Sequence, residues 1–462
     1  MFSKILSAAA VTIASFCANA NASNLSEMFC DGNMSLNPKQ IVSKANRAEI
    51  SDIIINKGSI NLSAVAGSEV KIPLYITDIE GKAFKTLDIT VEINGEKQNV
   101  TITPEDINNG NVCNVVVNAP DITGEMPLNI TIDKIDGIAN NGIYSGTEGK
   151  IKVLSRKVDH KVVVEEFTGF WCGWCPKGIV AMEKAKQVYG DKVIIVTVHQ
   201  KDALACKDYE TLANQTVANY PQAHVDRTIM SVDPYYGSSL YKVFGIGLDI
   251  EARAAIDPVA EVIAEGTIDG DVMTAKADVK FLYTGAAHHA LAFVLTENNM
   301  KNENWLQNNF LTQWKGQPIE ELEPMFDKWI NGEAKMKDIV FDDVAMVAKG
   351  IEGGIAGSIP SYVTEEESNT YEVEFDLRSI KKIMDYDELN LCVFLFDTTT
   401  GHVENADSKS FNPFASIDGI TEDTEKVETA RYTIDGKRIN APQKGLNIIK
   451  YSDGSAKKVM IK

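Results

Sequence analysis

The sequence predicts a multidomain protein in which two β-sandwiches flank an α/β domain and a short β tail ends the chain. Three observations carry this prediction. Short segments with alternating apolar and polar residues recur before residue 154 and again after residue 257. Between them the pattern changes to strand, helix, strand, helix, strand, which is typical of an α/β domain. The length of 462 residues suits about three domains.

The first 22 residues have the features of a secretory signal peptide. Lys4 gives a positive start, residues 5–18 are largely apolar, and small-x-small cleavage sites follow at residues 18–20 and 20–22. A buried N-terminal helix is the alternative. No later run approaches the roughly eighteen apolar residues that are needed to span a bilayer. We therefore expect an exported chain without a transmembrane segment.

Residues 23–154 are expected to form the N-terminal β-sandwich. The segments "EVKIPLYITD", "LDITVEING" and "VCNVVVNAP" alternate apolar and polar residues, and turn residues such as Asn94-Gly95 separate them. Short strands at this spacing are typical of an immunoglobulin-like sandwich. No catalytic constellation is visible in this part of the sequence.

Residues 155–256 carry the α/β pattern. "KVVVEEF" is predicted as a buried strand, the apolar residues from Ile179 to Tyr189 recur at helical spacing, and Gly190 is a helix stop. "DKVIIVTV" and "PQAHVDRTIM" are predicted strands, with helices in "DYETLANQTVANY" and over residues 238–256. We expect the strands to pair in parallel.

The remaining chain is predicted as a second β-sandwich over residues 257–412, a polar linker over 413–430 and a β tail over 431–462 with two Asp-Gly turns. His288-His289, beside the strand "ALAFVL", is predicted as a turn pair. An insertion at residues 300–355 is rich in Asn, Trp and acidic residues. We expect it either to line a binding surface or to cover the second sandwich.

The stretch "FWCGWCP" places a Cys-x-x-Cys pair between a predicted strand and a predicted helix. The first turn of a helix leaves N–H groups unpaired and carries partial positive charge. A thiolate there is stabilised, and its pKa can fall from about 8.5 to roughly 3.5–7.5. Pro176 is tolerated because first-turn N–H groups lack intrahelical partners. We expect Cys172, exposed at the helix start, to attack and Cys175 to resolve the mixed disulfide.

Two other interpretations of the pair stay open. A zinc site needs four ligands, but no second Cys-x-x-Cys exists and His199 and His224 stand alone in the sequence, so no metal is predicted. A static disulfide is harder to dismiss, because the exported setting permits closed pairs. The other cysteines after the signal peptide could form disulfides in three full pairings. They are Cys30, Cys113, Cys206 and Cys392.

The segment "VVVEEFTGFWCGWCP" resembles the active-site segment of the thioredoxin superfamily. That superfamily often carries a buried acid six positions before the first cysteine and a cis-proline opposite the disulfide. The resemblance implies a proton-accepting Glu166, a cis-proline at Pro221, where an ordinary strand-start proline is the alternative, and a redox-active Cys172–Cys175 disulfide. The Gly-Trp dipeptide departs from the usual Gly-Pro or Gly-His. The supporting residues are Trp171, Gly173, Trp174 and Tyr220.

A narrower resemblance adds "YPQAHVDR" to the cysteine segment. Together they are similar to the outer-membrane antigen family of Bacteroidetes named for a twenty-eight-kilodalton member, over roughly residues 157–411. Asp226 stands where that family usually has Asn. The final "GLNIIKYSDGSAKKVMIK" resembles the C-terminal β tails of exported Bacteroidetes proteins, some of which are type IX secretion signals. These resemblances imply the outer membrane, the cell surface or secretion, with the periplasm as the alternative.

The expected function is an exported thiol–disulfide oxidoreductase or isomerase. It would act on protein thiols or disulfides, or exchange electrons with an upstream redox donor, without a cofactor. The alternative is a non-catalytic surface or adhesion protein that binds a surface ligand and uses the thioredoxin-like domain as a scaffold. The formal net charge of −20 argues against nucleic acid as a partner, because phosphate contacts need an excess of Lys and Arg.

Overall fold

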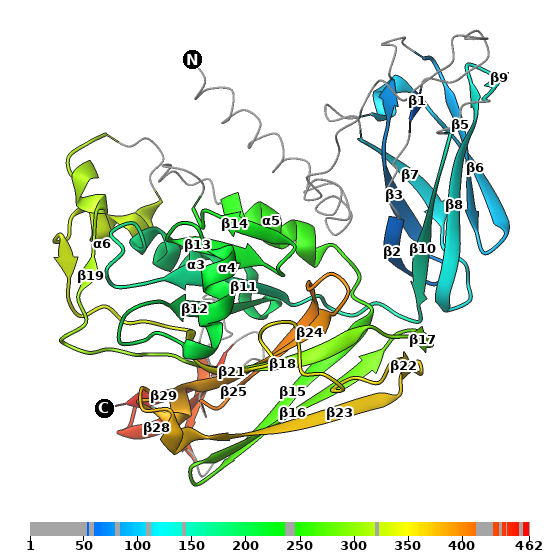
Figure 1. Cartoon of the computed structure of the whole chain (residues 1–462). Coiled ribbons are helices and arrows are strands. Elements are labelled where there is room, and N and C mark those ends of the chain that lie inside the picture. The colour runs from blue at the N-terminus through cyan, green and yellow to red at the C-terminus, as the bar shows by residue number, and fades with distance from the viewer. Residues whose placement is uncertain are drawn as a thin grey trace. The chain divides into compact units, whose positions relative to one another are not determined.

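The computed structural model describes residues 53–54, 60–78, 84–107, 112–140, 145–235, 245–318, 323–412, 428–433, 437–439, 441–451 and 456–461. The predicted signal peptide and residues 413–427 of the predicted linker lie outside these ranges. The chain divides into two compact units, Met1–Asp385 with Asn390–Lys409, and Tyr386–Leu389 with Ser410–Lys462. The multidomain, β-rich architecture predicted from the sequence is confirmed (Figure 1).

The N-terminal part is a β-sandwich because alternate residues of its strands point into one shared apolar core. Within β5, for example, Leu87 to Ile93 alternate between buried and half-buried. The same core takes residues from both sheets, so the sheets pack face to face. The larger sheet has the order β2 (Ile60–Val65), β10 (Gly146–Leu154), β8 (Gly124–Ile135), β5 (Leu87–Ile93), β6 (Glu96–Ile102), with β9 (Ile138–Ala139) beside β8. The smaller pairs are β3 (Glu69–Tyr75) with β7 (Val112–Asn118) and β1 (Ile53–Ile54) with β4 (Thr77–Asp78).

The α/β part is built on four strands in the order β12, β11, β13, β14. Strand β11 (Val162–Thr168) pairs in parallel with β12 (Val193–His199), but antiparallel with β13 (Gln222–Val225), which itself pairs antiparallel with β14 (Ile229–Val232). The expected all-parallel pairing is therefore wrong beyond β12. The predicted single strand "PQAHVDRTIM" splits into β13 and β14, because Asp226 and Arg227 both adopt positive φ, of 47° and 55°.

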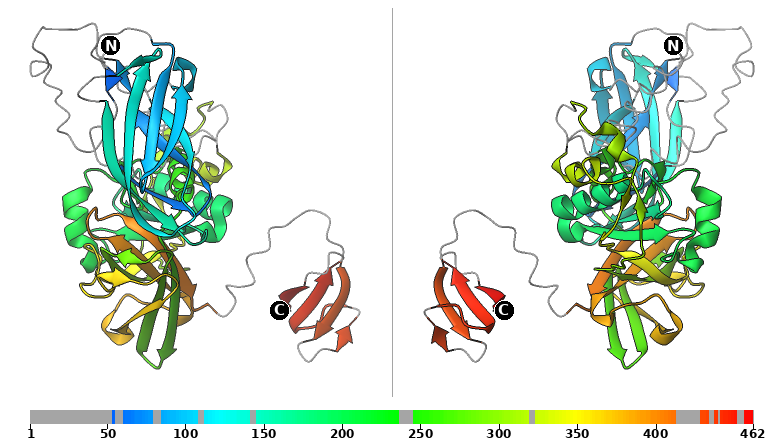
Figure 2. Two further views of the ribbon diagram at one scale, coloured as in Figure 1. Left: turned by 90° about the vertical axis from the view of Figure 1, so that its right-hand side faces the viewer. Right: turned by 90° about the vertical axis from the view of Figure 1, so that its left-hand side faces the viewer.

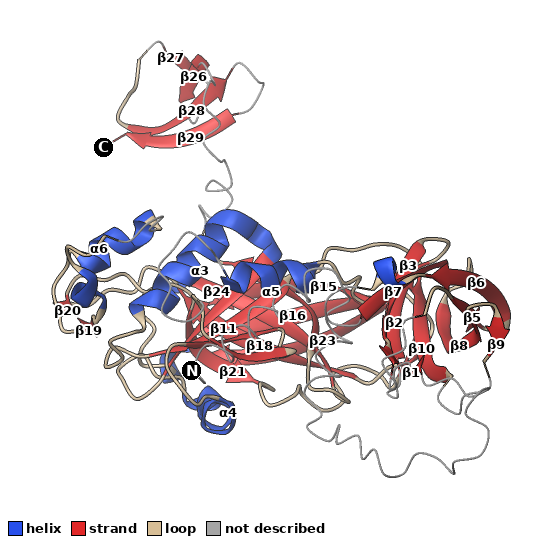
Figure 3. Cartoon of the chain, turned by 90° about the horizontal axis from the view of Figure 1, so that it is seen from above, coloured by secondary structure: helices blue, strands red, loops and turns tan. Residues whose placement is uncertain are grey.

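Helices cover both faces of these strands (Figure 3). Helix α3 (Pro176–Tyr189) and α5 (Gly245–Ala254) share a core with Val162 and Val164 of β11, whereas α4 (Glu210–Thr216) packs on the opposite face against Val163 and Phe167. Successive side chains of a strand point to opposite faces, so each face of β11 has its own core. Helix α3 ends at Gly190 with φ of 58°, as predicted.

The same sheet continues beyond the α/β part, across the boundary expected between residues 256 and 257. Strand β12 pairs in parallel with β21 (Val344–Lys349), and β18 (His289–Glu297), β24 (Leu389–Asp397) and β25 (Val403–Ser410) follow to complete eight strands. A three-stranded sheet of β15 (Ala260–Asp269), β16 (Val272–Phe281) and β23 (Ser368–Asp376) faces it. Contacts between the two faces include Phe293 with Tyr371 and Phe281 with His289. The expected turn at His289 is wrong, because this residue is buried and begins β18.

Shorter elements complete the chain. They are β17 (Gly285–Ala286) with β22 (Tyr362–Val363), β19 (Gln307–Asn308) with β20 (Lys335–Met336), and the single helical turn α6 (Asp327–Ile330). The tail is one antiparallel sheet in the order β27 (Arg438–Ile439), β26 (Glu428–Thr433), β28 (Gly445–Tyr451), β29 (Ala456–Ile461) (Figure 2). It begins at Glu428, three residues before the predicted start, and both predicted Asp-Gly turns lie outside the described residues. None of the helices in the described ranges has the length and apolar content that a bilayer crossing requires.

Candidate thiol–disulfide site

The two cysteines of the Cys-x-x-Cys motif lie in the turn that joins β11 to α3. Cys172 and Cys175 form a disulfide, and Pro176 is the first residue of α3, so Cys175 occupies the N-cap position. Gly169 O accepts a hydrogen bond from the Cys172 amide at 3.0 Å, which closes the turn before the helix. The pair therefore sits where the unpaired N–H groups of the first helical turn are concentrated.

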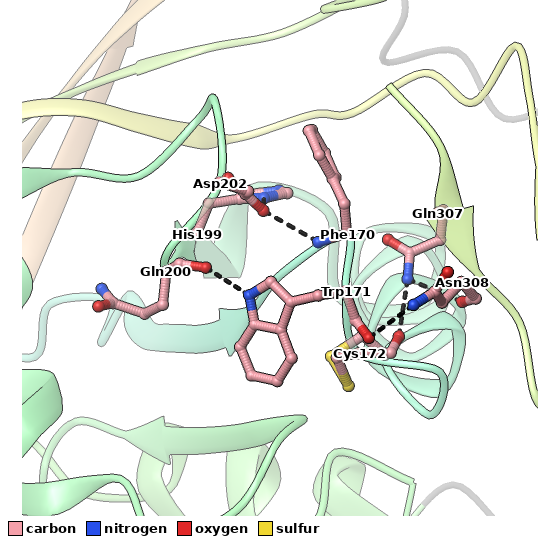
Figure 4. The surroundings of a disulfide bond; sticks show 9 residues. Phe170, Trp171, Cys172, His199, Gln200, Asp202, Gln307 and Asn308 are labelled. Atoms are coloured by element: carbon pink, nitrogen blue, oxygen red, sulfur yellow. Dashed lines mark hydrogen bonds and ion pairs between the residues drawn. A yellow bond between two sulfur atoms is a disulfide. The ribbon is translucent and has the colours of Figure 1, made fainter. Parts of the chain in front are cut away.

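Cys172 is not exposed, contrary to the expectation from its place at the helix start. Only 5% of its surface is accessible, and Cys175 is fully buried. A polypeptide segment from the insertion also crosses the turn and contacts its backbone (Figure 4). Reactivity at Cys172 must therefore be judged with this segment in place.

Residues 305–314, called the strap below, make these contacts and were not recognised as part of the site. Four successive carbonyl oxygens, those of residues 170 to 173, each accept a hydrogen bond from the strap at 2.8 Å. The donors are Asn308 N, Asn308 Nδ2, Gln307 Nε2 and Phe310 N, in that order. The insertion, expected to line a binding surface or to cover the second sandwich, thus packs on the cysteine turn. No motif links residue 307 to residue 172, and only the Asn and Gln content of the insertion hinted at polar contacts.

The opposite side of the turn is held by the loop that follows β12. The Phe170 amide donates to Asp202 Oδ2 at 2.9 Å, and the Trp171 indole N–H donates to the Gln200 carbonyl at 2.7 Å (Figure 4). Asp202 also pairs with His199 Nδ1 at 2.8 Å. His199 is therefore a partner of this carboxylate. Across the described residues, no group of three or more His, Cys, Asp or Glu side chains is arranged to hold a metal ion.

Glu166 lies buried beneath the first turn of α3. A Cβ added to Gly178 of α3 would overlap Glu166 Oε1, so the carboxyl group and the helix backbone are in close contact. Glu166 is 1% exposed, and burial raises the pKa of its carboxyl group to about 8, against a smaller lowering by the Thr168 hydrogen bond. Glu166 Oε1 has no hydrogen-bond partner among the described residues. The carboxyl group is therefore mostly protonated at neutral pH.

The pKa of the neighbouring Glu165 is shifted in the opposite direction, because this side chain points to the other face of β11. Burial alone would raise its pKa, but the Arg227 guanidinium, which donates to both carboxylate oxygens at 2.7 and 2.8 Å, holds the pKa below its usual value. Asp226 likewise pairs with Arg253 at 2.8 Å and with His160 at 3.1 Å. These buried pairs fix the turn between β13 and β14. Glu166, by contrast, has the Thr168 hydrogen bond but no ion-pair partner among the described residues.

The Tyr220–Pro221 peptide bond is cis, as the thioredoxin resemblance implies. The Pro221 ring lies 3.2 Å from the position that a Cβ on Gly178 would take, so it packs on the start of α3. The Tyr220 ring meets Trp171 edge to face with ring centroids 5.0 Å apart. A groove of about 440 Å³ runs beside these residues. Its lining includes Trp174, Lys177, Tyr220, Pro221, Gln222 and Asp233.

Aromatic rings surround the dipeptide between the cysteines. A Cβ on Gly173 would overlap the Phe310 ring, so only glycine fits beneath the strap at this position. Trp174 contacts Phe310 and Trp314 with ring centroids 5.8 and 5.3 Å apart. Trp171, Trp174 and Phe310 still expose 42%, 37% and 52% of their surfaces. The rim of the site is thus apolar and accessible, although the two cysteines are buried.

The other cysteines in the described ranges are remote from this chemistry. Cys113, Cys206 and Cys392 are free and buried, and burial raises the pKa of each thiol, to about 11 for Cys113 and about 12 for Cys392. Cys30 lies outside the described residues. Buried, protonated thiols are poor nucleophiles, so these three are structural.

Comparisons with known proteins give little beyond the fold. No family model and no curated protein matches the chain. Among solved structures, HBP35 of Porphyromonas gingivalis is 18% identical, with a TM-score of 0.38, and the match covers 66% of this chain and 99% of HBP35. Protein AGR_C_4864 from Agrobacterium tumefaciens is 16% identical with a TM-score of 0.31, covering 56% of this chain and 97% of that one.

A third likeness concerns a smaller part of the chain. The CARDB domain of the PF1109 protein from Pyrococcus furiosus is 17% identical with a TM-score of 0.17, over 23% of this chain and 94% of that domain. All three TM-scores lie below 0.5, so the likenesses indicate neither a ligand nor an activity for this chain. Membership in the Bacteroidetes antigen family stays a prediction, and the conclusion that the structure itself supports is a thioredoxin-like unit with a closed Cys172–Cys175 disulfide inside a larger β-rich chain.

Proposed function

We propose that the protein is an exported thiol–disulfide oxidoreductase or isomerase that works through Cys172 and Cys175. The observation that carries the proposal is their disulfide at the start of α3, whose first turn lies above the buried Glu166, an acid without an ion-pair partner. A static disulfide has no need for a buried acid without an ion-pair partner beneath it, and burying such a group costs stability even with the Thr168 hydrogen bond. The substrates would be disulfides or thiols of other proteins.

The reaction would proceed in two displacements. The Cys172 thiolate attacks one sulfur of the substrate disulfide, so that a mixed disulfide forms and one substrate thiolate leaves. Cys175 then loses its proton, attacks Cys172 Sγ and releases the second substrate thiolate, which closes the Cys172–Cys175 disulfide. Two electrons pass from the protein to the substrate, and a dithiol donor returns two electrons and two protons.

In its ionised form, which a pKa of about 8 leaves in the minority at neutral pH, Glu166 would accept the Cys175 proton. Its pKa of about 8 lies close to that of a free cysteine, about 8.5, so the transfer between them costs little free energy. Tyr220 and Pro221 would line the groove along which an extended substrate approaches. The Gly173-Trp174 dipeptide carries no charge to favour a thiolate, which supports a reducing or isomerising role over an oxidising one.

The test is the reduction of a small disulfide-bonded protein such as insulin by dithiothreitol, followed by turbidity. The native chain should accelerate the reaction, Cys172→Ser should abolish the acceleration, and Cys175→Ser should accumulate a mixed disulfide that mass spectrometry detects. Cys206→Ser, which removes a buried free thiol, is the matched control and should keep full activity. If the native chain is no faster than Cys172→Ser, the binding-protein hypothesis replaces this one.

Export and location form a separate part of the proposal. The N-terminal sequence supports export, and the C-terminal sheet supports a surface or secreted location, with the periplasm as the alternative. Cell fractionation with surface protease treatment would distinguish them. Recovery of the chain only from the cytoplasm, with residues 1–22 retained, would contradict export.

A further inference from the structure

We propose that Gln307 and Asn308 are positioning residues that hold the Cys-Gly-Trp-Cys turn in its closed form. The strap would then favour the oxidised state and would itself be loosened when the disulfide is reduced. This inference rests on the proposed function for its biological use, because it makes the strap a regulator of the same site. The coupling itself concerns only the disulfide and can be measured without turnover.

The first argument is the completeness of the contact. The strap satisfies the carbonyl oxygens of four consecutive residues, Phe170 to Gly173, each at 2.8 Å. Figure 4 shows the bonds that the Gln307 and Asn308 side chains donate. The turn makes fewer and longer hydrogen bonds within itself. Its internal bonds run from the Cys172 amide to Gly169 O at 3.0 Å and from the Cys175 amide to Cys172 O at 3.4 Å. The shape of the turn is therefore set by the strap more than by its own hydrogen bonds.

The second argument is that the strap has anchors of its own. β19 pairs with β20, and the Asn309 side chain donates to Trp329 O at 2.7 Å and to Glu333 O at 3.0 Å. Leu311 is fully buried in the same apolar core as Val180 of α3. None of these contacts involves the cysteines. The hydrogen-bond donors of the strap are therefore held in place by contacts that do not depend on the cysteine turn. This is the condition for one element to position another.

The burial of the Gln307 side chain lowers the stability of the fold, so its position needs another explanation. The residue has no accessible surface, and its Nε2 donates to Cys172 O and Asn308 O at 2.8 and 2.9 Å. Both of these atoms are carbonyl oxygens that can only accept, so the amide nitrogen of Gln307 must point toward them. Gln307 Oε1 has no hydrogen-bond partner among the described residues. A buried acceptor without a partner is destabilising, and this amide is kept for the bond that it donates to the cysteine backbone.

The consequence for redox equilibrium follows from which state the strap fits. In the oxidised protein the turn is closed by the covalent bond, and the strap matches that shape. Reduction breaks the disulfide bond and places one proton on each sulfur atom, so that the two sulfur atoms can move apart. Opening of the turn then requires the four hydrogen bonds from the strap to be weakened or broken. The strap thus raises the effective concentration of one thiol at the other. Because such coupling is reciprocal, reduction must weaken the strap contacts by the same factor.

The experiment compares the full chain with Asn308→Ala and Gln307→Ala in mixtures of reduced and oxidised dithiothreitol. At equilibrium, two electrons and two protons pass from dithiothreitol to the protein disulfide, and dithiothreitol closes to its cyclic form. Free thiols are trapped by alkylation and counted by mass. Each variant should lower the equilibrium constant for disulfide formation by about fivefold to tenfold, the factor expected for one hydrogen bond. Tenfold corresponds to a reduction potential about 30 mV less negative.

Matched controls come from the same segment. Asn304→Ala and Gln313→Ala remove exposed amide side chains that do not hydrogen-bond to the turn, and both should leave the equilibrium constant within twofold of the native value. Asn308→Ala keeps the backbone bond from Asn308 N to Phe170 O, so it tests the side chain alone. If Gln307→Ala does not fold, Asn308→Ala decides the question. An unchanged constant in Asn308→Ala, or an equal shift in the controls, would overturn the proposal.

A second measurement checks reciprocity in the native chain. Hydrogen exchange of the Asn308 and Phe310 amides, which donate to Phe170 O and Gly173 O, should become at least about fivefold faster on reduction. Equal exchange in the two states would contradict the coupling. Failure of the insulin assay with a retained potential shift would reject the proposed function while leaving this inference standing.

Discussion

Replacing Glu166 by glutamine should change how the stability of the α/β part depends on pH. The folded chain keeps a proton on Glu166 up to a pKa of about 8, whereas an unfolded chain loses it near 4.5. Between these values the folded state binds more protons than the unfolded state, so the free energy of unfolding falls as the pH rises. Glutamine cannot ionise, so Glu166→Gln should lack this loss.

The magnitude follows from the interval between the two pKa values. At about 1.4 kcal/mol for each unit, an interval from 4.5 to about 8 corresponds to about 5 kcal/mol. The burial of the carboxyl group is complete, so no solvent screening reduces this figure. Relative to the variant, native stability should therefore be full below the unfolded pKa and should be lost progressively as the pH rises through about 8.

Urea unfolding followed by tryptophan fluorescence is a suitable assay, because the five tryptophans of the chain all lie in or near the α/β part, at positions 171, 174, 305, 314 and 329. The free energy of unfolding would be compared between the native chain and the variant from about pH 5 to about pH 9. Glu210→Gln, an exposed carboxylate on α4, is the control and should give a constant difference. A difference for Glu166→Gln that stays constant with pH, or that changes with the opposite sign, would refute the reasoning.

Three further outcomes are expected. After reduction, Cys172 should be alkylated faster at neutral pH than Cys206, whose buried thiol has a raised pKa, and equal rates by mass spectrometry would contradict this. Gly178→Ala should destabilise the chain by about 1–3 kcal/mol in urea unfolding, because the added Cβ would overlap Glu166. This loss should outweigh the higher helix preference of alanine. A stabilised variant would show that Glu166 moves aside at little cost. Arg227→Met should cost about 3–5 kcal/mol, because the buried glutamate that it pairs with would be left as an uncompensated charge, and a loss below about 1 kcal/mol would count against that pair.

Local patterns predicted local structure well. The spacing of apolar residues located α3 and its end at Gly190, and the cis bond before Pro221 followed from the thioredoxin resemblance and is confirmed. The split of the third strand was missed because Asp226 and Arg227 adopt a backbone conformation that is uncommon outside glycine. Buried ion pairs and hydrogen bonds with residues distant in sequence stabilise it. The interactions that decide this turn are absent from its own sequence.

The strap could not be predicted for a related reason. Gln307 lies 135 residues from Cys172, and the insertion shows neither an amphipathic period nor a motif that names its target. The expectation of an exposed Cys172 failed because exposure at a helix start was judged from the turn alone, without the rest of the fold around it. Periodicity reports which face of an element is apolar, but it does not report which distant loop will cover it.

The shared eight-stranded sheet determines where this chain can be cut. In a fragment that ends after α5, the edge of β12 that pairs with β21 would be open, and Ile194 and Val196 would lose the apolar neighbours that β18 and β24 provide. An open apolar edge is a template for association between chains. Laboratory fragments that aim to preserve the cysteine turn should therefore extend through β25. The α/β part looks like an independent module, but the strand that pairs with its β12 edge lies more than 140 residues further along the chain.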